Sequence, residues 1–207
     1  TRRYERLHRD GDKSETAVLM DWRAGPDGPP VVDGQSYSKR AHLAEAAEVY
    51  CRVSRYLSDC AVGVPQIYKA DEGDGFVLLE DLGTRTLDVM AHENDDDLPA
   101  FYLEAIETLI HLHKAGAPDF LHAYDGDVMA VETGLFLDWY LPDRGLEIAA
   151  PARQQWMDMW HALARLSDSE APVCVLRDFH SVNLLWQPRK QGRHRIGVID
   201  VQDALAG

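Results

Sequence analysis

Apolar and polar residues alternate along four short stretches in the first part of the chain. Two of them, residues 4–10 and 16–22, are joined by the sequence GDKSE, and two more, residues 65–71 and 75–81, share the turn sequence EGDG. Alternation with a period of two is typical of a strand with one buried face, and a short connection that contains Gly is typical of a hairpin. We therefore predict two β-hairpins.

Helical spacing dominates other parts of the chain. From Ser38 to Leu57 apolar residues recur every three or four positions, which predicts one amphipathic helix, whereas the Gly- and Pro-rich residues 23–35 predict a loop. The same spacing predicts four further helices, at residues 86–90, 98–116, 127–141 and 151–166. Three short apolar runs have the character of strands, at residues 173–176, 183–187 and 195–200.

The order of these elements predicts an α+β fold with two lobes. Strands with a single helix come first, and helices that enclose a small β unit follow. This order favours a small antiparallel β lobe at residues 1–82 and a larger, mainly helical lobe at residues 83–207, with a cleft between them. The segment at residues 81–86 is the expected boundary.

The charge balance of the chain excludes one class of partner. Its 207 residues carry 21 Lys and Arg against 35 Asp and Glu, a formal net charge of −14, and the basic residues form no stripe. A nucleic-acid partner is therefore not expected. Because an anionic ligand would be repelled at long range, a bound phosphate would have to be held by a local cluster of donors or by a metal ion.

Cysteine and hydropathy patterns indicate the compartment. Cys51, Cys60 and Cys174 have no C-x-x-C spacing, and fit reduced core thiols better than disulfides or zinc ligands. His111 and His113 lie in an apolar helix without a third ligand and are expected to be structural. The chain has no apolar stretch at its start and no run of about 18 apolar residues, so neither a signal peptide nor a membrane span is expected. We expect a cytoplasmic protein.

The residues best suited to chemistry lie near the end of the chain. Asp178 and Asn183 fall in the sequence LRDFHSVNLLW, between two short strands, and Asp200 ends the strand IGVID. Phosphoryl transfer from ATP uses a carboxylate that accepts the proton of the attacking hydroxyl, and oxygen ligands that hold Mg²⁺ on the phosphates. Asp178 could be that base, and Asn183 and Asp200 those ligands. Turn residues that satisfy backbone groups could have the same spacing, and it is the combination with Arg177 and the apolar runs that favours the chemical interpretation.

The segments RDFHSVNLLW and GVIDVQDA resemble the catalytic loop and the metal-binding segment of the aminoglycoside phosphotransferase and choline kinase superfamily, which has a protein-kinase-like fold. The loop of that family carries an Asp, a His two residues later and an Asn five residues later, and His180 matches this His. Further matches are TRRYERL, AVLMD, VLLEDLG and ETGLFLDWYLP, so the resemblance covers essentially the whole chain. Within the superfamily the sequence is most similar to bacterial anomeric kinases of N-acetylmuramate and N-acetylglucosamine.

The resemblance implies a nucleotide site in the first part of the chain. The backbone at Glu80, Asp81 and Leu82 would form the hinge between the lobes and meet adenine, and Arg2 and Arg3 would lie in the hairpin that covers the phosphates. The alternative for Glu80, Asp81 and Leu82 is simply the end of a buried strand followed by a turn. The alternative for Arg2 and Arg3 is a solvated basic segment.

The sequence departs from the wider kinase pattern at Met20, where a strand lysine usually points at the phosphates. The missing charge could be replaced by the metal ion or by one of four basic residues. These are Arg2, Arg3, Lys39 and Arg40. Glu45 stands at the place of the usual carboxylate partner of that lysine, and we expect it on the solvated face of the helix.

The helix that contains ETGLFLDWYLP is the expected acceptor side. Glu132, Phe136 and Trp139 or Tyr140 would share one helix face, which would combine a carboxylate for sugar hydroxyls with a ring for the apolar face of a sugar. Aromatic residues of a helix core would have the same spacing. Glu132 and Trp139, together with His180 of the catalytic loop, are the predicted substrate residues.

These features predict an ATP- and Mg²⁺-dependent phosphotransferase that moves the γ-phosphoryl group to a hydroxyl of a small-molecule acceptor, with an amino sugar favoured. An aminoglycoside or choline-type kinase is an alternative of the same class. A non-catalytic, nucleotide-binding pseudokinase module is an alternative of another class, which Met20 favours and the intact Asp178, Asn183 and Asp200 set opposes. The resemblance also implies a fused or partner ATPase module as a further candidate partner, and C-terminal helices beyond the given residues.

Overall fold

The computed structural model describes residues 2–10, 12–25, 28–32, 34–93, 95–167 and 169–207. The chain divides into two compact units, each assembled from three separate segments. The first consists of Thr1–Pro26, Ala44–Gly116 and Leu176–Ala204, and the second of Asp27–Leu43, Ala117–Val175 and Leu205–Gly207. The expected lobes at residues 1–82 and 83–207 stay a prediction.

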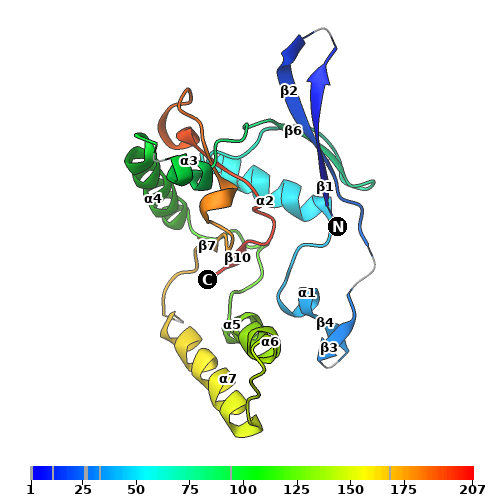
Figure 1. The fold of residues 1–207 in the computed structure, drawn as a ribbon, viewed down its shortest axis with the longest axis vertical. Coiled ribbons are helices and arrows are strands. Elements are labelled where there is room, and N and C mark those ends of the chain that lie inside the picture. The colour runs from blue at the N-terminus through cyan, green and yellow to red at the C-terminus, as the bar shows by residue number, and fades with distance from the viewer. Residues whose placement is uncertain (1, 11, 26–27, 33, 94, 168) are drawn as a thin grey trace. The chain divides into compact units, whose positions relative to one another are not determined.

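The first unit contains a four-stranded antiparallel sheet in the order β1-β2-β6-β5 (Figure 1). Its strands are β1 (Arg3–Arg9), β2 (Asp12–Asp21), β5 (Ile67–Asp71) and β6 (Phe76–Glu80). The two predicted hairpins are confirmed, and they join because β6 also pairs with β2. Since side chains alternate between the faces of a strand, Val18 and Met20 of β2 share one face of this sheet.

The segment between the two hairpins differs from the single helix expected at Ser38–Leu57. The structure has a one-turn helix, α1 (Tyr37–Arg40), and a separate helix, α2 (Ala47–Asp59). The backbone between them is not helical, and His42 has a φ of 50°, which no residue inside a right-handed helix adopts. Apolar residues keep the helical spacing across this break, so the pattern does not reveal it. Glu45 lies exposed in the break, and its expected place on a helix is wrong.

Two further helices and a third hairpin also belong to the first unit. These elements are α3 (Leu87–Glu93), α4 (Leu98–Ala115), β8 (Leu184–Trp186) and β9 (Ile196–Val198). All four correspond to predicted elements. The buried residues of α4 fall three or four positions apart, as expected for a helix with one face in the core, and Phe101 among them contacts Trp186 of β8 with ring centroids 5.3 Å apart.

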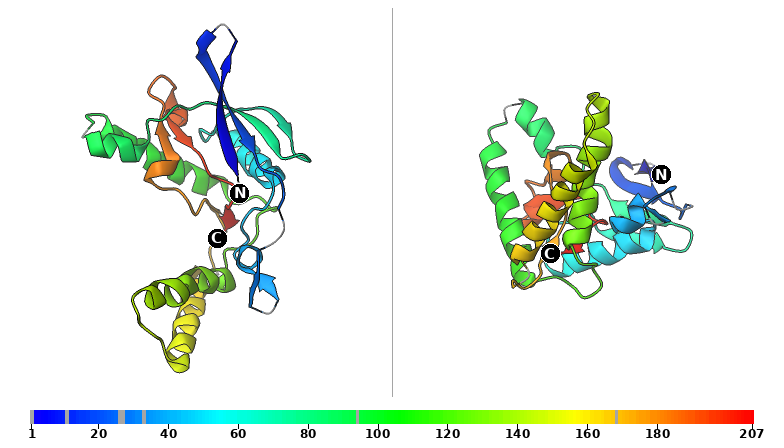
Figure 2. Two further views of the ribbon diagram at one scale, coloured as in Figure 1. Left: turned by 45° about the vertical axis from the view of Figure 1, so that its right-hand side comes forward. Right: turned by 90° about the horizontal axis from the view of Figure 1, so that it is seen from below.

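The second unit is mainly helical, and its helices α5 and α7 pack against each other (Figure 2). Besides α1, its elements are β3 (Pro30–Val32), β4 (Gln35–Ser36), α5 (Gly126–Leu135), a π-helix (Phe136–Tyr140), α6 (Leu141–Asp143), α7 (Ala150–Ala164), β7 (Cys174–Val175) and β10 (Leu205–Ala206). The predicted helices at residues 127–141 and 151–166 are confirmed, except that the first becomes π-helical. Pro142 has no N–H to continue α-helical hydrogen bonding, and the N–H of Leu141 bonds to the carbonyl of Phe136.

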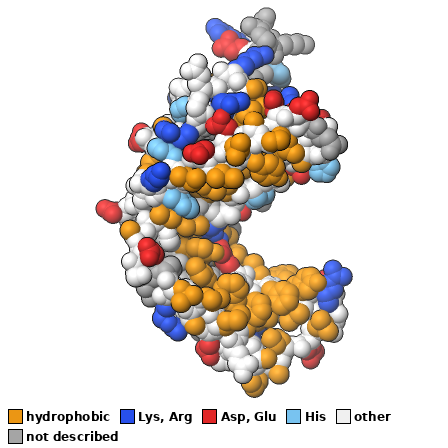
Figure 3. All heavy atoms as spheres, turned by 90° about the vertical axis from the view of Figure 1, so that its left-hand side faces the viewer, with side chains coloured by type: hydrophobic (Ala, Val, Ile, Leu, Met, Phe, Trp, Pro, Cys, Tyr) orange, Lys and Arg blue, Asp and Glu red, His pale blue; other side chains and the backbone are white. Residues whose placement is uncertain are grey.

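Both units expose apolar side chains. Examples are Leu103, Ile106 and Ile110 of α4 and Met159 and Leu163 of α7. Figure 3 shows hydrophobic side chains gathered on the surface. Across the described residues, no helix combines the length and the apolar character that crossing a membrane requires.

Gly63 lies where the loop after α2 meets β9. Its carbonyl oxygen accepts a hydrogen bond of 2.7 Å from the N–H of Val198. A Cβ at this position would lie 2.2 Å from the carbonyl oxygen of Ile196 and 3.1 Å from Cα of His194. Both neighbours are backbone atoms, so no side-chain rotation could relieve the contact. The absence of a side chain at Gly63 therefore allows the close approach of β9.

Gly63→Ala is expected to lower the free energy of unfolding by about 2–3 kcal/mol, because the loop or β9 has to shift to make room. Gly73→Ala is the matched control, since a Cβ there would have its nearest contact, Asp71 Oδ1, at 3.8 Å. Urea unfolding followed by tryptophan fluorescence would compare the two variants. Equal stability of Gly63→Ala and Gly73→Ala would contradict the close approach.

Candidate active site

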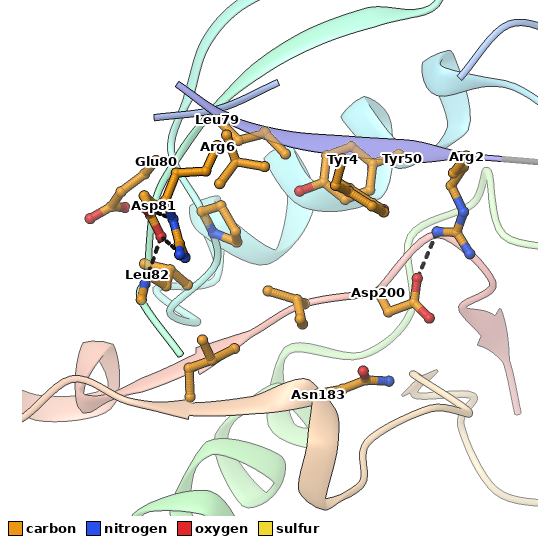
Figure 4. A pocket seen from close by; sticks show the side chains of 15 residues that line it. Arg2, Tyr4, Arg6, Tyr50, Leu79, Glu80, Asp81, Leu82, Asn183 and Asp200 are labelled. Carbon is orange, nitrogen blue, oxygen red and sulfur yellow. Dashed lines mark hydrogen bonds and ion pairs between the residues drawn. The ribbon is translucent and has the colours of Figure 1, made fainter. Parts of the chain in front are cut away.

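A cavity of about 560 Å³ lies within the first unit (Figure 4). Its walls come from β1, β2 and α2, from the end of β6, from β8, and from the residues that precede β8 and follow β9. Six of the residues singled out from the sequence line it. They are Arg2, Glu80, Asp81, Leu82, Asn183 and Asp200. The fold thus brings together residues as far apart in sequence as Arg2 and Asp200.

The predicted catalytic loop is held by its own backbone. The N–H of Asp178 bonds to the carbonyl of Leu176 at 2.7 Å, and the N–H of His180 bonds to the carbonyl of Asp178 at 3.0 Å. The N–H of Asn183 bonds in turn to the carbonyl of His180 at 2.9 Å. Arg177, just before Asp178, has a φ of 62°, in the left-handed region that residues with long side chains rarely adopt. Strained backbone of this kind clusters at functional sites.

Two hydrogen bonds orient the buried side chain of Asn183. Its Nδ2 lies 3.0 Å from the carbonyl oxygen of Asp178 and 3.2 Å from Nε2 of His180. Because a carbonyl oxygen can only accept, the amide nitrogen has to face Asp178, and Nε2 of His180 is then the acceptor of the second bond. The oxygen Oδ1 of Asn183 is left for other partners, and an amide oxygen is a ligand that Mg²⁺ accepts.

Asp200 follows β9 and has a φ of 60°. Asp is one of the few residues with a side chain that tolerates this left-handed conformation. Its Oδ1 accepts hydrogen bonds from Nη1 of Arg2 at 2.6 Å and from Nε2 of Gln202 at 3.1 Å. Gln202 is buried and also donates to Oδ2 of Asp203 at 3.0 Å. The turn therefore holds the carboxylate of Asp200 at the wall of the cavity.

The surroundings of Asp178 make its carboxylate more basic. Burial raises the pKa of Asp178, and the negative charges of Asp200 and Asp203 raise it further. Arg177 and His180 act in the opposite direction, but the pKa stays above the ordinary value of an aspartate. A carboxylate with a raised pKa is a better proton acceptor, as the predicted role of Asp178 requires.

Two side chains from the turn of the β8–β9 hairpin bind the predicted hinge. Nζ of Lys190 lies 2.6 Å from Oε1 of Glu80, and Nε2 of Gln187 donates to the carbonyl oxygen of Leu82 at 2.6 Å. The N–H of Glu80 bonds to the carbonyl of Gln66 at 2.8 Å. These contacts fix the backbone where β6 leaves the sheet.

Asp81 ties the hinge to β1. Nε and Nη2 of Arg6 bond to its two carboxylate oxygens at 2.6 and 3.0 Å, and only 6% of the Asp81 side chain is exposed. Burial by itself would raise the pKa of Asp81, but hydrogen bonds from Arg6, the Gly83 N–H and Thr16 outweigh it and hold the pKa below its ordinary value. The ionised form therefore stabilises the fold at a pH above the pKa of the unfolded chain, about 3.9, and this contribution is lost as the pH falls through the lower pKa of the folded chain.

Asp81→Asn is expected to be less stable than the wild type near neutral pH, and the difference in free energy of unfolding should shrink below about pH 4. Urea unfolding at a series of pH values would measure this difference. Glu15→Gln, which breaks the exposed Arg9–Glu15 pair of the same sheet, is the control and should have little effect. A difference that stays constant down to about pH 3 would speak against an ionised, hydrogen-bonded Asp81.

Not all residues predicted for the nucleotide reach the cavity. Arg3 is exposed and does not line it. Lys39 and Arg40 belong to α1 of the second unit. Met20 is fully buried, and Thr1 of the TRRYERL match lies outside the described residues. Of the four basic residues considered as substitutes for the strand lysine, Arg2 is the one that lines the cavity.

The residues predicted for the acceptor fall in different units. His180 is exposed in the catalytic loop of the first unit. Glu132 and Trp139 belong to the second unit, where Oε2 of Glu132 accepts a hydrogen bond of 2.6 Å from the hydroxyl of Tyr124. The Trp139 side chain is 73% exposed. Their contact with an acceptor stays a prediction.

Four residues that hold the site were outside the sequence-based prediction. They are Arg6, Gln187, Lys190 and Gln202. Arg6 and Gln202 lie inside the matched segments TRRYERL and GVIDVQDA, so the resemblance could have drawn attention to them. Gln187 and Lys190 lie at the β8–β9 turn, where no pattern distinguishes them from solvated residues.

The cavity fits a nucleotide with its metal ion. Asn183 and Asp200 offer two oxygen ligands, and Mg²⁺ usually takes one or two from the protein and the others from phosphate and water. Within the described ranges, no group of three or more His, Cys, Asp or Glu could form a metal site made only of protein ligands. Val18, Leu185 and Ile199 contribute apolar walls, which suit a planar base.

Comparison with known proteins agrees with this geometry. The chain matches the phosphotransferase enzyme family (APH) over residues 2–207. An N-acetylmuramate/N-acetylglucosamine kinase of Caulobacter vibrioides is 30% identical over 224 aligned residues, which cover 99% of this chain and 60% of that protein. A protein of the same name from Neisseria meningitidis serogroup B is 38% identical over 149 residues, which cover 70% of this chain and 43% of that protein. The chain thus spans less than two thirds of the length of these curated relatives.

Solved structures support the same assignment at the level of the fold. The ADP-bound aminoglycoside phosphotransferase APH(2'')-Ib has a TM-score of 0.54 and 16% identity, with all of this chain and 67% of that chain covered. The APH(2")-IIa structure with gentamicin has a TM-score of 0.50 and 16% identity, with 92% and 60% covered. The predicted protein-kinase-like α+β fold is confirmed. The chain belongs to the phosphotransferase enzyme family.

Proposed function

We propose that this chain forms the nucleotide-binding and catalytic part of a kinase that transfers the γ-phosphoryl group of ATP to a hydroxyl of an amino sugar. One observation carries the proposal: Asn183, Asp200 and the hinge residues Glu80–Leu82 line the same cavity. A phosphotransferase needs these parts together, because adenine has to be held at one end of the site and metal-bound phosphates at the other.

Each residue of the site has one task in this proposal. Asp178 accepts the proton of the attacking hydroxyl, which its raised pKa favours. Oδ1 of Asn183 and the carboxylate of Asp200 hold Mg²⁺, which when bound neutralises charge on the phosphates. The backbone at Glu80–Leu82 positions the base. Most of the rate enhancement comes from positioning and charge neutralisation, as expected for a loose transition state.

The name shared by the curated relatives supports an amino sugar as the acceptor. His180, Glu132 and Trp139 are the proposed acceptor contacts. A carboxylate accepts hydrogen bonds from sugar hydroxyls, and the exposed indole of Trp139 offers a flat apolar surface to a sugar ring. The fused or partner ATPase module also stays a prediction.

ADP formation by the full-length protein with ATP and Mg²⁺ would test the proposal. The acceptor panel would contain N-acetylmuramate, N-acetylglucosamine, other hexoses, choline and aminoglycosides. Stimulation by an amino sugar supports the proposal, and stimulation by choline or an aminoglycoside alone replaces its acceptor. Nucleotide binding without stimulation by any acceptor would favour a non-catalytic nucleotide-binding module.

A further inference from the structure

The described lining of the cavity contains two cationic side chains, Arg2 and Arg6. Arg6 already neutralises Asp81 of the hinge, to which it donates two hydrogen bonds. No lysine is among these lining residues, and Met20, on the same face of β2 as the cavity-lining Val18, is fully buried. Arg2 is therefore the cation that the described cavity can offer to an anionic ligand.

Arg2 is held by a carboxylate and an aromatic ring. Its Nη1 lies 2.6 Å from Oδ1 of Asp200, and its guanidinium carbon lies 4.8 Å from the ring centroid of Trp22. The side chains of Arg2 and Asp200 are 25% and 35% exposed, so the pair is accessible from the cavity (Figure 4). A guanidinium carries five N–H donors, and the bond to Asp200 uses one nitrogen, so donors remain for a second anion.

Asp200 has two competing partners. The proposed function requires its carboxylate for Mg²⁺, whereas in the structure the carboxylate is paired with Arg2. A metal ion and a guanidinium bound to the same carboxylate would repel each other strongly at such short distance. The phosphates of a nucleotide attract both cations. Arg2 therefore releases Asp200 to the metal more readily when another anion is present to receive it.

We propose that Arg2 exchanges partners when the nucleotide binds. It neutralises Asp200 in the nucleotide-free chain, and it pairs with the nucleotide phosphates once the metal ion takes Asp200. This inference rests on the proposed function, because it requires a nucleotide and a metal ion in this cavity. Arg2 then supplies the charge that the strand lysine supplies in other kinases. It also disfavours metal binding without nucleotide, since a free metal ion would have to break the ion pair.

Removal of the Arg2 charge is expected to change the affinities for two ligands in opposite directions. Arg2→Ala should weaken the binding of a non-hydrolysable ATP analogue with Mg²⁺ by about tenfold or more, because one charge-assisted hydrogen bond to phosphate is lost. The same substitution should strengthen the binding of Mn²⁺ alone by roughly severalfold, because Asp200 no longer has a competing partner. A general loss of structure would weaken both.

The experiment measures both affinities on the full chain. Titration calorimetry would follow the analogue with Mg²⁺, and electron paramagnetic resonance would follow Mn²⁺ alone. Arg9→Ala is the matched control, because it removes the same charge from β1, the strand that follows Arg2, and its partner Glu15 is exposed. In the double variant Arg2→Ala/Asp200→Asn the gain in Mn²⁺ affinity has to vanish, which assigns the gain to Asp200. Arg2→Lys keeps the cation and should recover much of the affinity for the analogue.

Opposite changes in Arg2→Ala, with wild-type behaviour in Arg9→Ala, would support the exchange of partners. Unchanged affinities, or a parallel weakening of both ligands, would overturn it and leave the proposed function standing. A wild-type chain that binds no nucleotide would overturn the proposed function, and the exchange with it.

Discussion

Asp178→Asn is expected to reduce turnover by about a thousandfold or more, because it removes the group that accepts the proton of the attacking hydroxyl. The affinity for ATP with Mg²⁺ should stay within about a factor of two, since Asp178 is needed for the chemical step and not for holding the nucleotide. The backbone bonds of the loop do not depend on the carboxylate, so the loop should keep its conformation. Steady-state kinetics together with calorimetry would separate the two effects.

The control for this prediction is Asp59→Asn, which makes the same change at an exposed residue at the end of α2. It should leave both quantities near the wild-type values. The pH profile gives a second check. Because the pKa of Asp178 is raised, kcat/KM should begin to fall on the acid side at a pH above the ordinary aspartate pKa of about 3.9. Turnover that persists in Asp178→Asn would remove this residue from the role of base.

The local elements could be predicted from the sequence because their patterns are local. Alternation within a few residues defined both hairpins, and three- and four-residue spacing defined α4 and α7. The break at His42 could not be predicted, because a left-handed residue leaves the apolar spacing around it unchanged. The two-residue strand β10 is too short to have a period, and its pairing with β7 depends on residues about thirty positions away.

In the candidate site, too, local patterns could be predicted from the sequence and contacts between distant residues could not. Asp178, Asn183 and Asp200 could be proposed as site residues because their spacing and apolar flanks are visible in one short stretch of sequence. The contacts that hold the hinge could not, because they join residues far apart, such as Gln187 and Leu82. A glutamine in a polar turn has the same local pattern whether it is solvated or bonded to a distant carbonyl.

Asp200 is paired with Arg2 in the structure, so its substitution should affect both the metal ion and the nucleotide. Asp200→Asn is expected to reduce turnover by about a thousandfold or more, because the metal ion loses its charged ligand. It should also weaken the binding of ATP in the presence of Mg²⁺, which Asp178→Asn should not do. Asn tolerates a φ of 60° as Asp does, and its side-chain oxygen can keep the bond from Gln202, so the turn should be preserved.

Nucleotide binding measured without metal distinguishes the loss of a metal-binding side chain from the disruption of the whole cavity. In Asp200→Asn the guanidinium of Arg2 no longer has a carboxylate partner, and it is free to meet the phosphates. Affinity for ATP in the presence of a chelator should therefore be equal to or higher than that of the wild type, while Mg²⁺ should no longer increase it. If Mg²⁺ increased ATP affinity as much in Asp200→Asn as in the wild type, Asp200 would not be a metal ligand. If affinity fell equally with and without metal, the substitution would have disrupted the cavity itself, and the thermal unfolding midpoint of the variant should then fall as well.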